Sequence, residues 1–175
     1  MISPKEFLRI ELERGISPFN PKFVKKRAQL AQMMEPYKHL KTIDYGAGTG
    51  VYAEEFRKAG FDVVAQDIWK EHRDFMKENY PGLKVVARPV KAEFMLFIEV
   101  AEHMADSEID KAIEKIDPEF ILFSSTSNRD PYDEKWGHVN IKEQPEWVKF
   151  WKDRGYEVKQ EMRNPTKWTK LLQRN

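Results

Sequence analysis

A segment with three closely spaced glycines has the composition of a cofactor-binding loop. Residues 44–50 read Asp-Tyr-Gly-Ala-Gly-Thr-Gly and lie between an apolar run and an amphipathic stretch. Gly46, Gly48 and Gly50 let the backbone turn tightly and approach a ligand closely. The helix N-terminus expected after them offers unpaired N–H groups and a partial positive charge to a carboxylate or phosphate. The segment therefore predicts a site for a nucleotide-like cofactor.

The spacing around this loop narrows the class of cofactor. Dinucleotide enzymes carry their third glycine one residue later than Gly50, where this chain has Val51. Asp67 follows the apolar run 63–66, and its carboxylate can accept hydrogen bonds from two ribose hydroxyls at once. The spacing argues against a dinucleotide oxidoreductase, which stays as the weaker alternative.

A second group of chemically active residues is Glu99, Glu102 and His103, which would share one face of a helical turn. With His138 as a further ligand they could hold a divalent metal, and carboxylate with imidazole suits Mg²⁺ or Mn²⁺. Alternatively, His103 or His138 acts as a general base, because imidazole titrates near neutrality. A third interpretation is that the segment only shapes a pocket. Glu102, His103 and His138 are the candidate catalytic residues.

A polar loop at residues 127–138 carries the candidate substrate-binding residues Tyr132, Trp136 and His138. Loops at the carboxyl ends of parallel strands often form such pockets. Equally, the two aromatic side chains could only attach the loop to the core. A basic group, Lys22, Lys25, Lys26 and Arg27, could steer an anionic acceptor, although a solvated helix face is the favoured interpretation.

From Leu40 onward, short apolar runs alternate with amphipathic stretches, as in a parallel sheet covered by helices on both faces. The predicted strands are Thr42–Tyr45, Asp62–Gln66, Leu83–Ala87, Phe94–Glu99 and Phe120–Ser124. The predicted helices between them are Val51–Ala59, Lys70–Asn79 and Ser107–Ile116.

Both ends of the chain depart from this alternation. Ser3 is expected to cap a helix that runs to about Gly15, and a second helix follows Asn20-Pro21 and stops near Pro36. Near the C-terminus a helix at 145–154 precedes two strands, 156–163 and 168–174, joined by four residues. Such a short link requires an antiparallel pair, since a parallel crossover needs a dozen residues or more.

Composition excludes several classes of chemistry. The 175 residues include no cysteine, which excludes disulfides, thiolate zinc sites and iron–sulfur clusters. A net charge of +1 argues against a nucleic-acid partner without excluding one. The sequence shows neither a bilayer-spanning run nor a signal peptide, so we expect a cytoplasmic protein with no membrane partner.

The spacing of Gly46, Gly48 and Gly50 resembles motif I of the class I S-adenosylmethionine-dependent methyltransferases. The likeness extends from Leu40 to Asn175 and includes the strand followed by Glu99-x-x-Glu102-His103. It implies an α/β, Rossmann-like, doubly wound fold: a mostly parallel seven-stranded sheet with an antiparallel last strand, in three αβα layers. Residues 1–39 would be helices packed on the core and 40–175 the methyltransferase domain, together one structural domain.

The resemblance also implies S-adenosylmethionine as cofactor, with Asp44 near its methionine amine. The connection Arg88–Glu93 is shorter than is usual in the family, where an adenine contact is expected. Ile68 and Trp69 could cover the base instead, or Trp69 could simply pack on the next helix. The expected cofactor-binding residues are Asp44, Gly46, Gly48, Gly50, Asp67, Ile68 and Glu99.

Two groups of relatives bear on the acceptor. Glu-x-x-Glu-His resembles the metal-binding residues of plant small-RNA 2′-O-methyltransferases and of certain quinone-pathway O-methyltransferases. The compact chain leaves room for a modest pocket and shows no obvious docking domain, so we expect methyl transfer to a small-molecule oxygen or nitrogen. The alternatives are a metal-assisted RNA 2′-O-methyltransferase and a module that binds S-adenosylmethionine without catalysis.

Overall fold

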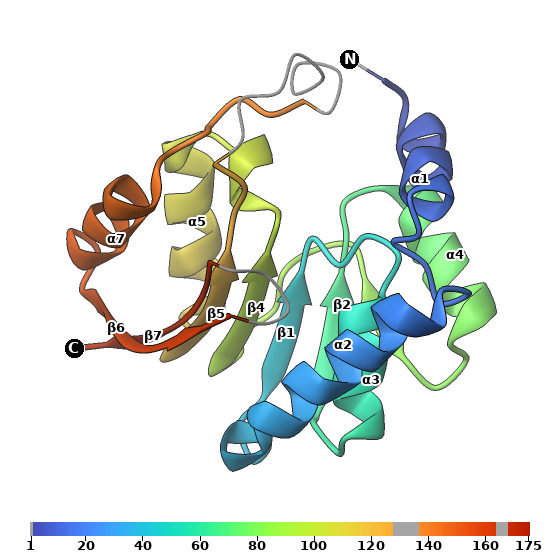
Figure 1. Cartoon of the computed structure of the whole chain (residues 1–175), viewed down its shortest axis with the longest axis horizontal. Coiled ribbons are helices and arrows are strands. Elements are labelled where there is room, and N and C mark those ends of the chain that lie inside the picture. Colours follow the sequence, from blue (N-terminus) through green and yellow to red (C-terminus); the bar gives the residue numbers. More distant parts are fainter. Residues whose placement is uncertain (1, 128–136, 164–167) are drawn as a thin grey trace.

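The structure, a computed structural model, describes residues 2–127, 137–163 and 168–175. Its centre is a seven-stranded sheet with the strand order β3-β2-β1-β4-β5-β7-β6 (Figure 1). The first five strands pair in parallel, and β7 pairs antiparallel with both β5 and β6. The strands are β1 (Thr42–Tyr45), β2 (Val63–Gln66), β3 (Lys84–Val86), β4 (Phe94–Ile98), β5 (Phe120–Ser124), β6 (Tyr156–Met162) and β7 (Thr169–Arg174).

Helices cover both faces of the sheet, because its central strands are apolar on both sides. Successive side chains of a strand point to opposite faces. Along β4, Phe94 and Leu96 therefore join one core cluster, whereas Met95 and Phe97 join the other. The helices are α1 (Pro4–Glu13), α2 (Pro21–Met33), α3 (Val51–Lys58), α4 (Lys70–Asn79), α5 (Asp106–Ile116) and α7 (Gln144–Lys152).

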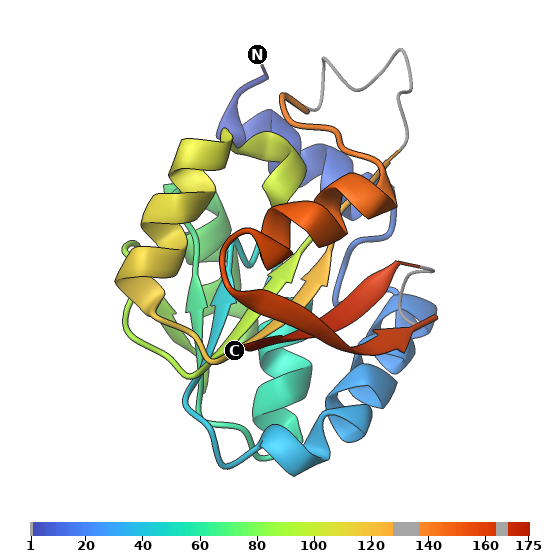
Figure 2. The ribbon, with the colours of Figure 1, turned by 90° about the vertical axis from the view of Figure 1, so that its left-hand side faces the viewer.

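Each core cluster belongs to a different helical layer. Leu30 of α2, Phe56 of α3 and Met76 of α4 pack on one face. Ile109 of α5 and Trp151 of α7 pack on the other, which faces the viewer in Figure 2. The doubly wound, three-layer α/β fold with an antiparallel last strand is therefore confirmed.

The predicted element bounds agree closely with the structure. β1, β5 and α4 have the bounds expected from the sequence, and the other strands and helices after Leu40 differ by one or two residues at an end. The first helix stops at Glu13 instead of reaching Gly15, whose φ of 79° is left-handed. Ser3 caps this helix, since its hydroxyl accepts the Glu6 N–H at 3.2 Å.

The two N-terminal helices lie against opposite parts of one layer. α1 contacts α4 beside the carboxyl ends of the strands, and α2 contacts α3 (Figure 1). The division of the chain at residue 39 stays a prediction. Within the described residues, no helix is long and apolar enough to cross a bilayer.

Candidate active site

The glycine loop leaves β1 with all three glycines in the left-handed region. The φ angles are 69° at Gly46, 55° at Gly48 and 75° at Gly50, a conformation that costs other residues about 1–2 kcal/mol. A Cβ on Gly46 would lie 2.8 Å from a methyl group of Val100. The loop therefore follows a path that side chains would block.

Gly48 and Gly50 differ in what they face. A Cβ on Gly48 would lie 3.0 Å from the Glu11 carboxylate, and both residues line a cavity. A Cβ on Gly50 would lie 2.6 Å from the Met76 Cγ, inside the core. Gly50, expected as a cofactor contact, instead packs the loop against α4.

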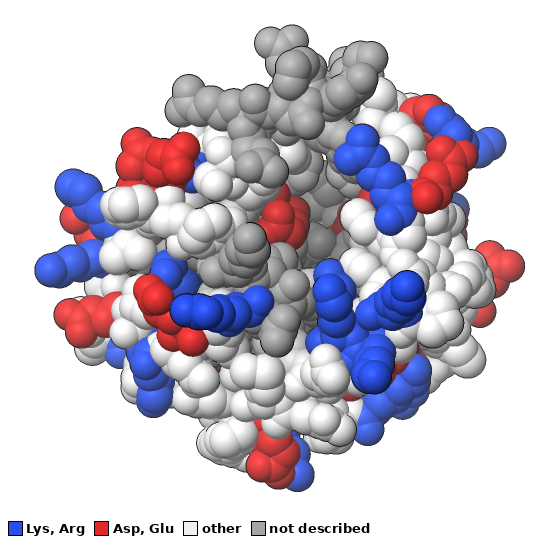
Figure 3. All heavy atoms as spheres, in the orientation of Figure 1, with Lys and Arg blue, Asp and Glu red and all other residues white. Residues whose placement is uncertain are grey.

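A cavity of about 850 Å³ opens where β1, β2 and β4 end, as expected for a parallel sheet. α1 and α2 contribute one side of its wall. The space-filling view shows basic side chains over α2, beside a hollow with acidic atoms inside it (Figure 3). The expected site residues on its wall are Asp44, Gly46, Gly48, Asp67, Ile68, Glu99, Glu102, His103 and His138.

Asp44 lies at the end of β1 and is only 4% exposed. Its Oδ2 accepts the Ala53 N–H of α3 at 3.0 Å. Burial raises the pKa of Asp44 to about 7, and the hydrogen bond from Ala53 opposes that shift. The residue expected beside the methionine amine thus also stabilises the helix that follows the loop.

Asp67 holds the glycine loop from the end of β2. Its Oδ2 accepts the Gly48 N–H at 3.0 Å, and its Oδ1 accepts the Trp69 N–H at 2.9 Å. Burial raises the pKa of Asp67, whereas His72 and these hydrogen bonds lower it. The carboxylate expected to bind ribose is therefore fixed in place by two backbone amides.

The two residues after Asp67 differ in environment. Ile68 lines the cavity and is 71% exposed, so its apolar side chain is available to a ligand. The Trp69 ring packs edge-on against Phe7 of α1 at 5.1 Å and tilts against His72 of α4 at 5.2 Å. For Trp69 the packing interpretation therefore describes the structure, although its side chain also borders the cavity.

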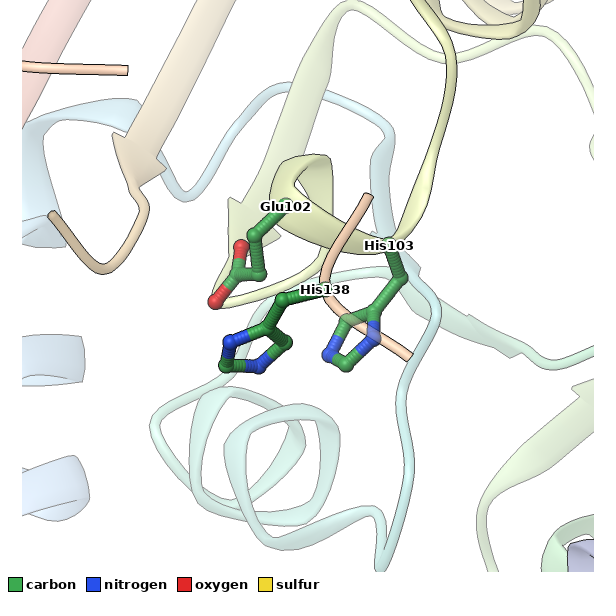
Figure 4. Close-up of side chains that lie close together, drawn as sticks. All are labelled: Glu102, His103 and His138. Atoms are coloured by element: carbon green, nitrogen blue, oxygen red, sulfur yellow. The ribbon is translucent and has the colours of Figure 1, made fainter. Parts of the chain in front are cut away.

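The structure brings together three of the four expected metal ligands. Glu102, His103 and His138 offer ligand atoms that all lie within 4.8 Å of one another (Figure 4). Glu99 lies outside this group, and the prediction that it shares their helical face is wrong. The helical turn begins only at Ala101, and Glu99 has a left-handed φ of 55°.

Glu99 and Glu102 form an interacting pair of carboxyl groups. Ser124 donates to Glu99 at 2.7 Å, and Ser125 donates to Glu102 at 2.9 Å. The Glu99 side chain lines the cavity, yet desolvation by the surrounding protein raises its pKa. Burial also raises the pKa of Glu102, which is 1% exposed, and the charge of Glu99 adds to that shift.

Backbone hydrogen bonds place His138 beside this pair. The Glu102 carbonyl accepts the N–H groups of Val139 and Asn140 at 2.8 and 3.0 Å. The His103 and His138 rings then meet edge to face, 4.7 Å apart. Tyr132 and Trp136, the other substrate-side candidates, lie outside the described residues.

Glu11 of α1 and His72 of α4 are among the wall residues that were not expected from the sequence. His72 Nε2 lies 2.8 Å from Glu11 Oε2. Each stands four residues from an apolar neighbour on its helix, Phe7 and Met76. A charged or titratable residue on the apolar face of a helix was the sequence signal that could have identified each of them as a site residue.

The basic group on α2 divides into two kinds of residue. Lys22, Lys25 and Lys26 are exposed, as a solvated helix face requires. Arg27 instead lies on the Phe23 ring, 3.4 Å from its centroid, and lines the cavity. Its buried Nε has no hydrogen-bond partner among the described residues.

Comparison with known proteins identifies the family. A model described as a methyltransferase domain matches residues 7–175. The chain belongs to this methyltransferase family. It is an S-adenosylmethionine-dependent enzyme with the Rossmann-like fold of that family, as the glycine loop predicts.

Two curated relatives and one solved structure illustrate the likeness. The chain is 25% identical over 184 residues to the ubiquinone biosynthesis O-methyltransferase of Bartonella bacilliformis, covering 93% of this chain and 73% of that one. It is 28% identical over 152 residues to the enzyme of the same name from Dinoroseobacter shibae, covering 79% of this chain and 60% of that one. Magnesium protoporphyrin IX methyltransferase from Synechocystis, with bound SAM, shares the fold with a TM-score of 0.62 and 13% sequence identity. The match covers 98% of this chain and 96% of that one.

The wall of the cavity fits such a cofactor. Gly48 brings side-chain-free backbone to the cavity wall, and the carboxylate of Asp67 can accept from hydroxyl donors. Arg27 brings a guanidinium with a buried, unpartnered nitrogen, which suits a carboxylate. These features suit a ligand that carries ribose hydroxyls and a carboxylate.

Proposed function

We propose that this enzyme methylates a hydroxyl group of a small molecule. The observation that carries the proposal is the grouping of Glu102, His103 and His138 on the wall of the same cavity as the glycine loop. Both curated relatives are named O-methyltransferases, which supports an oxygen acceptor. Cytoplasmic location and the lack of a membrane partner remain predictions.

When bound, S-adenosylmethionine supplies an electrophilic methyl group on a sulfonium. Asp67 accepts hydrogen bonds from the ribose, and Arg27 pairs with the aminoacyl carboxylate. Asp44 and Glu99 contribute negative charge on the side of the cavity expected to face the amine. These contacts align the methyl group with the acceptor, which is the main requirement of an in-line transfer.

A hydroxyl acceptor must also lose a proton. We propose that the His103–His138 pair takes it, because both rings border the cavity and imidazole titrates near neutral pH. Glu102, behind the pair, would stabilise the imidazolium that forms. The chain's own residues then perform both parts of the reaction, alignment and proton removal.

A second candidate is a metal-assisted mechanism. Glu102, His103 and His138 would hold Mg²⁺ or Mn²⁺, which would lower the pKa of the acceptor hydroxyl. The clustering within 4.8 Å favours it, together with the burial of Glu102, whose ionised form a cation would stabilise. RNA 2′-hydroxyls are the alternative acceptors for this mechanism.

Methyl transfer to a panel of phenols, catechols, amines and RNA 3′-ends tests the proposal, with and without chelator. We expect transfer to a small hydroxyl compound and its loss in His103→Ala. Calorimetry with S-adenosylhomocysteine and NADP accompanies it. Tight binding without transfer to any acceptor would indicate a non-catalytic module, and binding of NADP alone would indicate an oxidoreductase.

A further inference from the structure

Two carboxylates from distant parts of the chain converge on Gly48. Asp67 Oδ2 accepts the Gly48 N–H at 3.0 Å. Glu11 Oε1, from α1, lies 3.0 Å from the position that a Cβ on Gly48 would occupy. Both carboxylates border the cavity. The glycine thus lies between an acceptor on the sheet and an acceptor on the N-terminal helix.

Glu11 is held in this position by His72. Its Oε2 lies 2.8 Å from the His72 Nε2, with Glu11 8% and His72 1% exposed. Burying a carboxylate is costly unless hydrogen bonds compensate it. Burial raises the pKa of Glu11, whereas the interaction with His72 lowers it. His72 therefore orients Glu11 and supports its ionised form.

Both carboxylates retain capacity to accept further hydrogen bonds. An ionised carboxylate has about four lone-pair positions. Asp67 uses one position for Gly48 and one for Trp69, and Glu11 uses one for His72. A ligand beside Gly48 that carries adjacent O–H donors would satisfy the remaining positions.

We infer that Glu11 is a cofactor-positioning residue, which accepts a hydrogen bond from one ribose hydroxyl while Asp67 accepts from the other. This inference rests on the proposed function, because it takes S-adenosylmethionine as the ligand of the cavity. It makes α1 part of the cofactor site. His72 acts through Glu11, as a residue that positions it.

A purely structural role for the Glu11–His72 pair is the main alternative. In that case the pair only attaches α1 to α4, and its loss would weaken every ligand of the cavity to the same degree. A direct contact with ribose would instead weaken only those ligands that carry the contacted hydroxyl. The distinction requires a cycle of protein variants and ligand variants.

The experiment measures binding of S-adenosylhomocysteine and of its 2′-deoxy and 3′-deoxy analogues by calorimetry. The variants are Glu11→Gln and Asp67→Asn, with Glu13→Gln, an exposed residue of α1, as the matched control. We expect Glu11→Gln to weaken S-adenosylhomocysteine about tenfold. For one deoxy analogue this loss should disappear, and for Asp67→Asn it should disappear with the other.

His72 provides a second, independent arm. His72→Gln retains a side-chain N–H for Glu11, whereas His72→Phe removes it. We expect nearly normal affinity in the first and a loss similar to that of Glu11→Gln in the second. Thermal unfolding of each variant verifies that it is folded. If Glu11→Gln does not fold, the comparison of the two His72 variants still tests the inference.

Equal losses for all three ligands in Glu11→Gln, or no loss at all, would overturn the inference. Equal affinity of the two His72 variants would also overturn it. If the unmodified protein failed to bind S-adenosylhomocysteine, the proposed function itself would fail. The two failures are therefore distinguishable.

Discussion

The carboxylate of Asp44 accepts the backbone N–H of Ala53 at 3.0 Å, so a residue at the end of β1 caps helix α3. That helix begins after Gly50, which has no side chain to perform this role. The first N–H groups of a helix need partners from outside it. The glycine loop is therefore closed by a charged residue that is almost completely buried.

Replacement of Asp44 by Asn should stabilise the fold at alkaline pH. Burial raises the pKa of Asp44 to about 7 from an ordinary value of 3.8. A folded-state pKa above the unfolded one means that Asp44 contributes stability at low pH, which is lost as pH rises from about 4 to 7. Asn removes this titration and can still accept from Ala53.

Asp44→Asn should therefore raise the unfolding free energy more at pH 8 than at pH 5, and the difference should be about 2–3 kcal/mol. Urea denaturation at both pH values measures it, with the exposed Asp62→Asn as control. Affinity for S-adenosylhomocysteine should fall in the same variant. A gain that does not depend on pH would show that ionisation of Asp44 costs the folded protein no stability.

Gly48 and Gly50 should respond differently to substitution by Ala. Gly50→Ala adds a Cβ 2.6 Å from the Met76 Cγ, so it should lose about 2–4 kcal/mol of stability through strain and overpacking. Gly48→Ala faces only the end of the Glu11 side chain, so it should cost the left-handed penalty of about 1–2 kcal/mol and, in addition, weaken cofactor binding.

Gly60 provides the control for backbone strain alone. Its φ is 94°, and a Cβ would meet nothing within 4 Å. Gly60→Ala should therefore lose only about 1–2 kcal/mol of stability, which is the cost of the left-handed conformation. Thermal and urea unfolding of the three variants checks the order. Equal losses at Gly50 and Gly60 would contradict the packing argument.

The sequence predicts those parts of the fold that local patterns determine. The continuous apolar runs at Phe94–Ile98 and Phe120–Ser124 indicate strands buried on both faces, and the structure agrees. The contact between Glu11 and His72 could not be predicted, because it joins two helices at residues 61 positions apart in the sequence. The position of Glu99 was mispredicted because helical spacing was extended before the turn begins.

Arg27 should determine the affinity for the aminoacyl end of the cofactor. Its guanidinium lies over Phe23 and within 4.9 Å of the Tyr52 ring centroid, and no described residue bonds its Nε. Arg27→Met keeps much of the apolar contact and removes the charge. Affinity for S-adenosylhomocysteine should fall about tenfold.

The same substitution should leave 5′-methylthioadenosine unaffected, because that compound lacks the carboxylate. Lys26→Met, at an exposed position of the same helix, is the matched control. Calorimetry with both ligands gives the comparison. Equal losses for the two compounds would mean that Arg27 supports the shape of the cavity and does not bind the carboxylate.

The grouping of Glu102, His103 and His138 makes a prediction for metal binding that separates the two proposed mechanisms. If the group holds a divalent cation, the protein should bind one Mn²⁺, detectable by electron paramagnetic resonance. His103→Ala and His138→Ala should each weaken it about tenfold or more, since each removes a ligand. Glu99→Gln should have a smaller effect, because Glu99 lies outside the group.

The exposed His39 supplies the control variant, His39→Ala, which should bind Mn²⁺ normally. Loss of methyl transfer on chelation, restored by Mn²⁺ or Mg²⁺, would favour the metal-assisted mechanism. Activity that survives chelation but is lost in His103→Ala or His138→Ala would favour proton removal by an imidazole. The Glu102 carboxylate lies within 4.8 Å of a nitrogen of each imidazole, where its ionised form would hold a cation or stabilise an imidazolium, so Glu102→Gln should impair transfer in both cases.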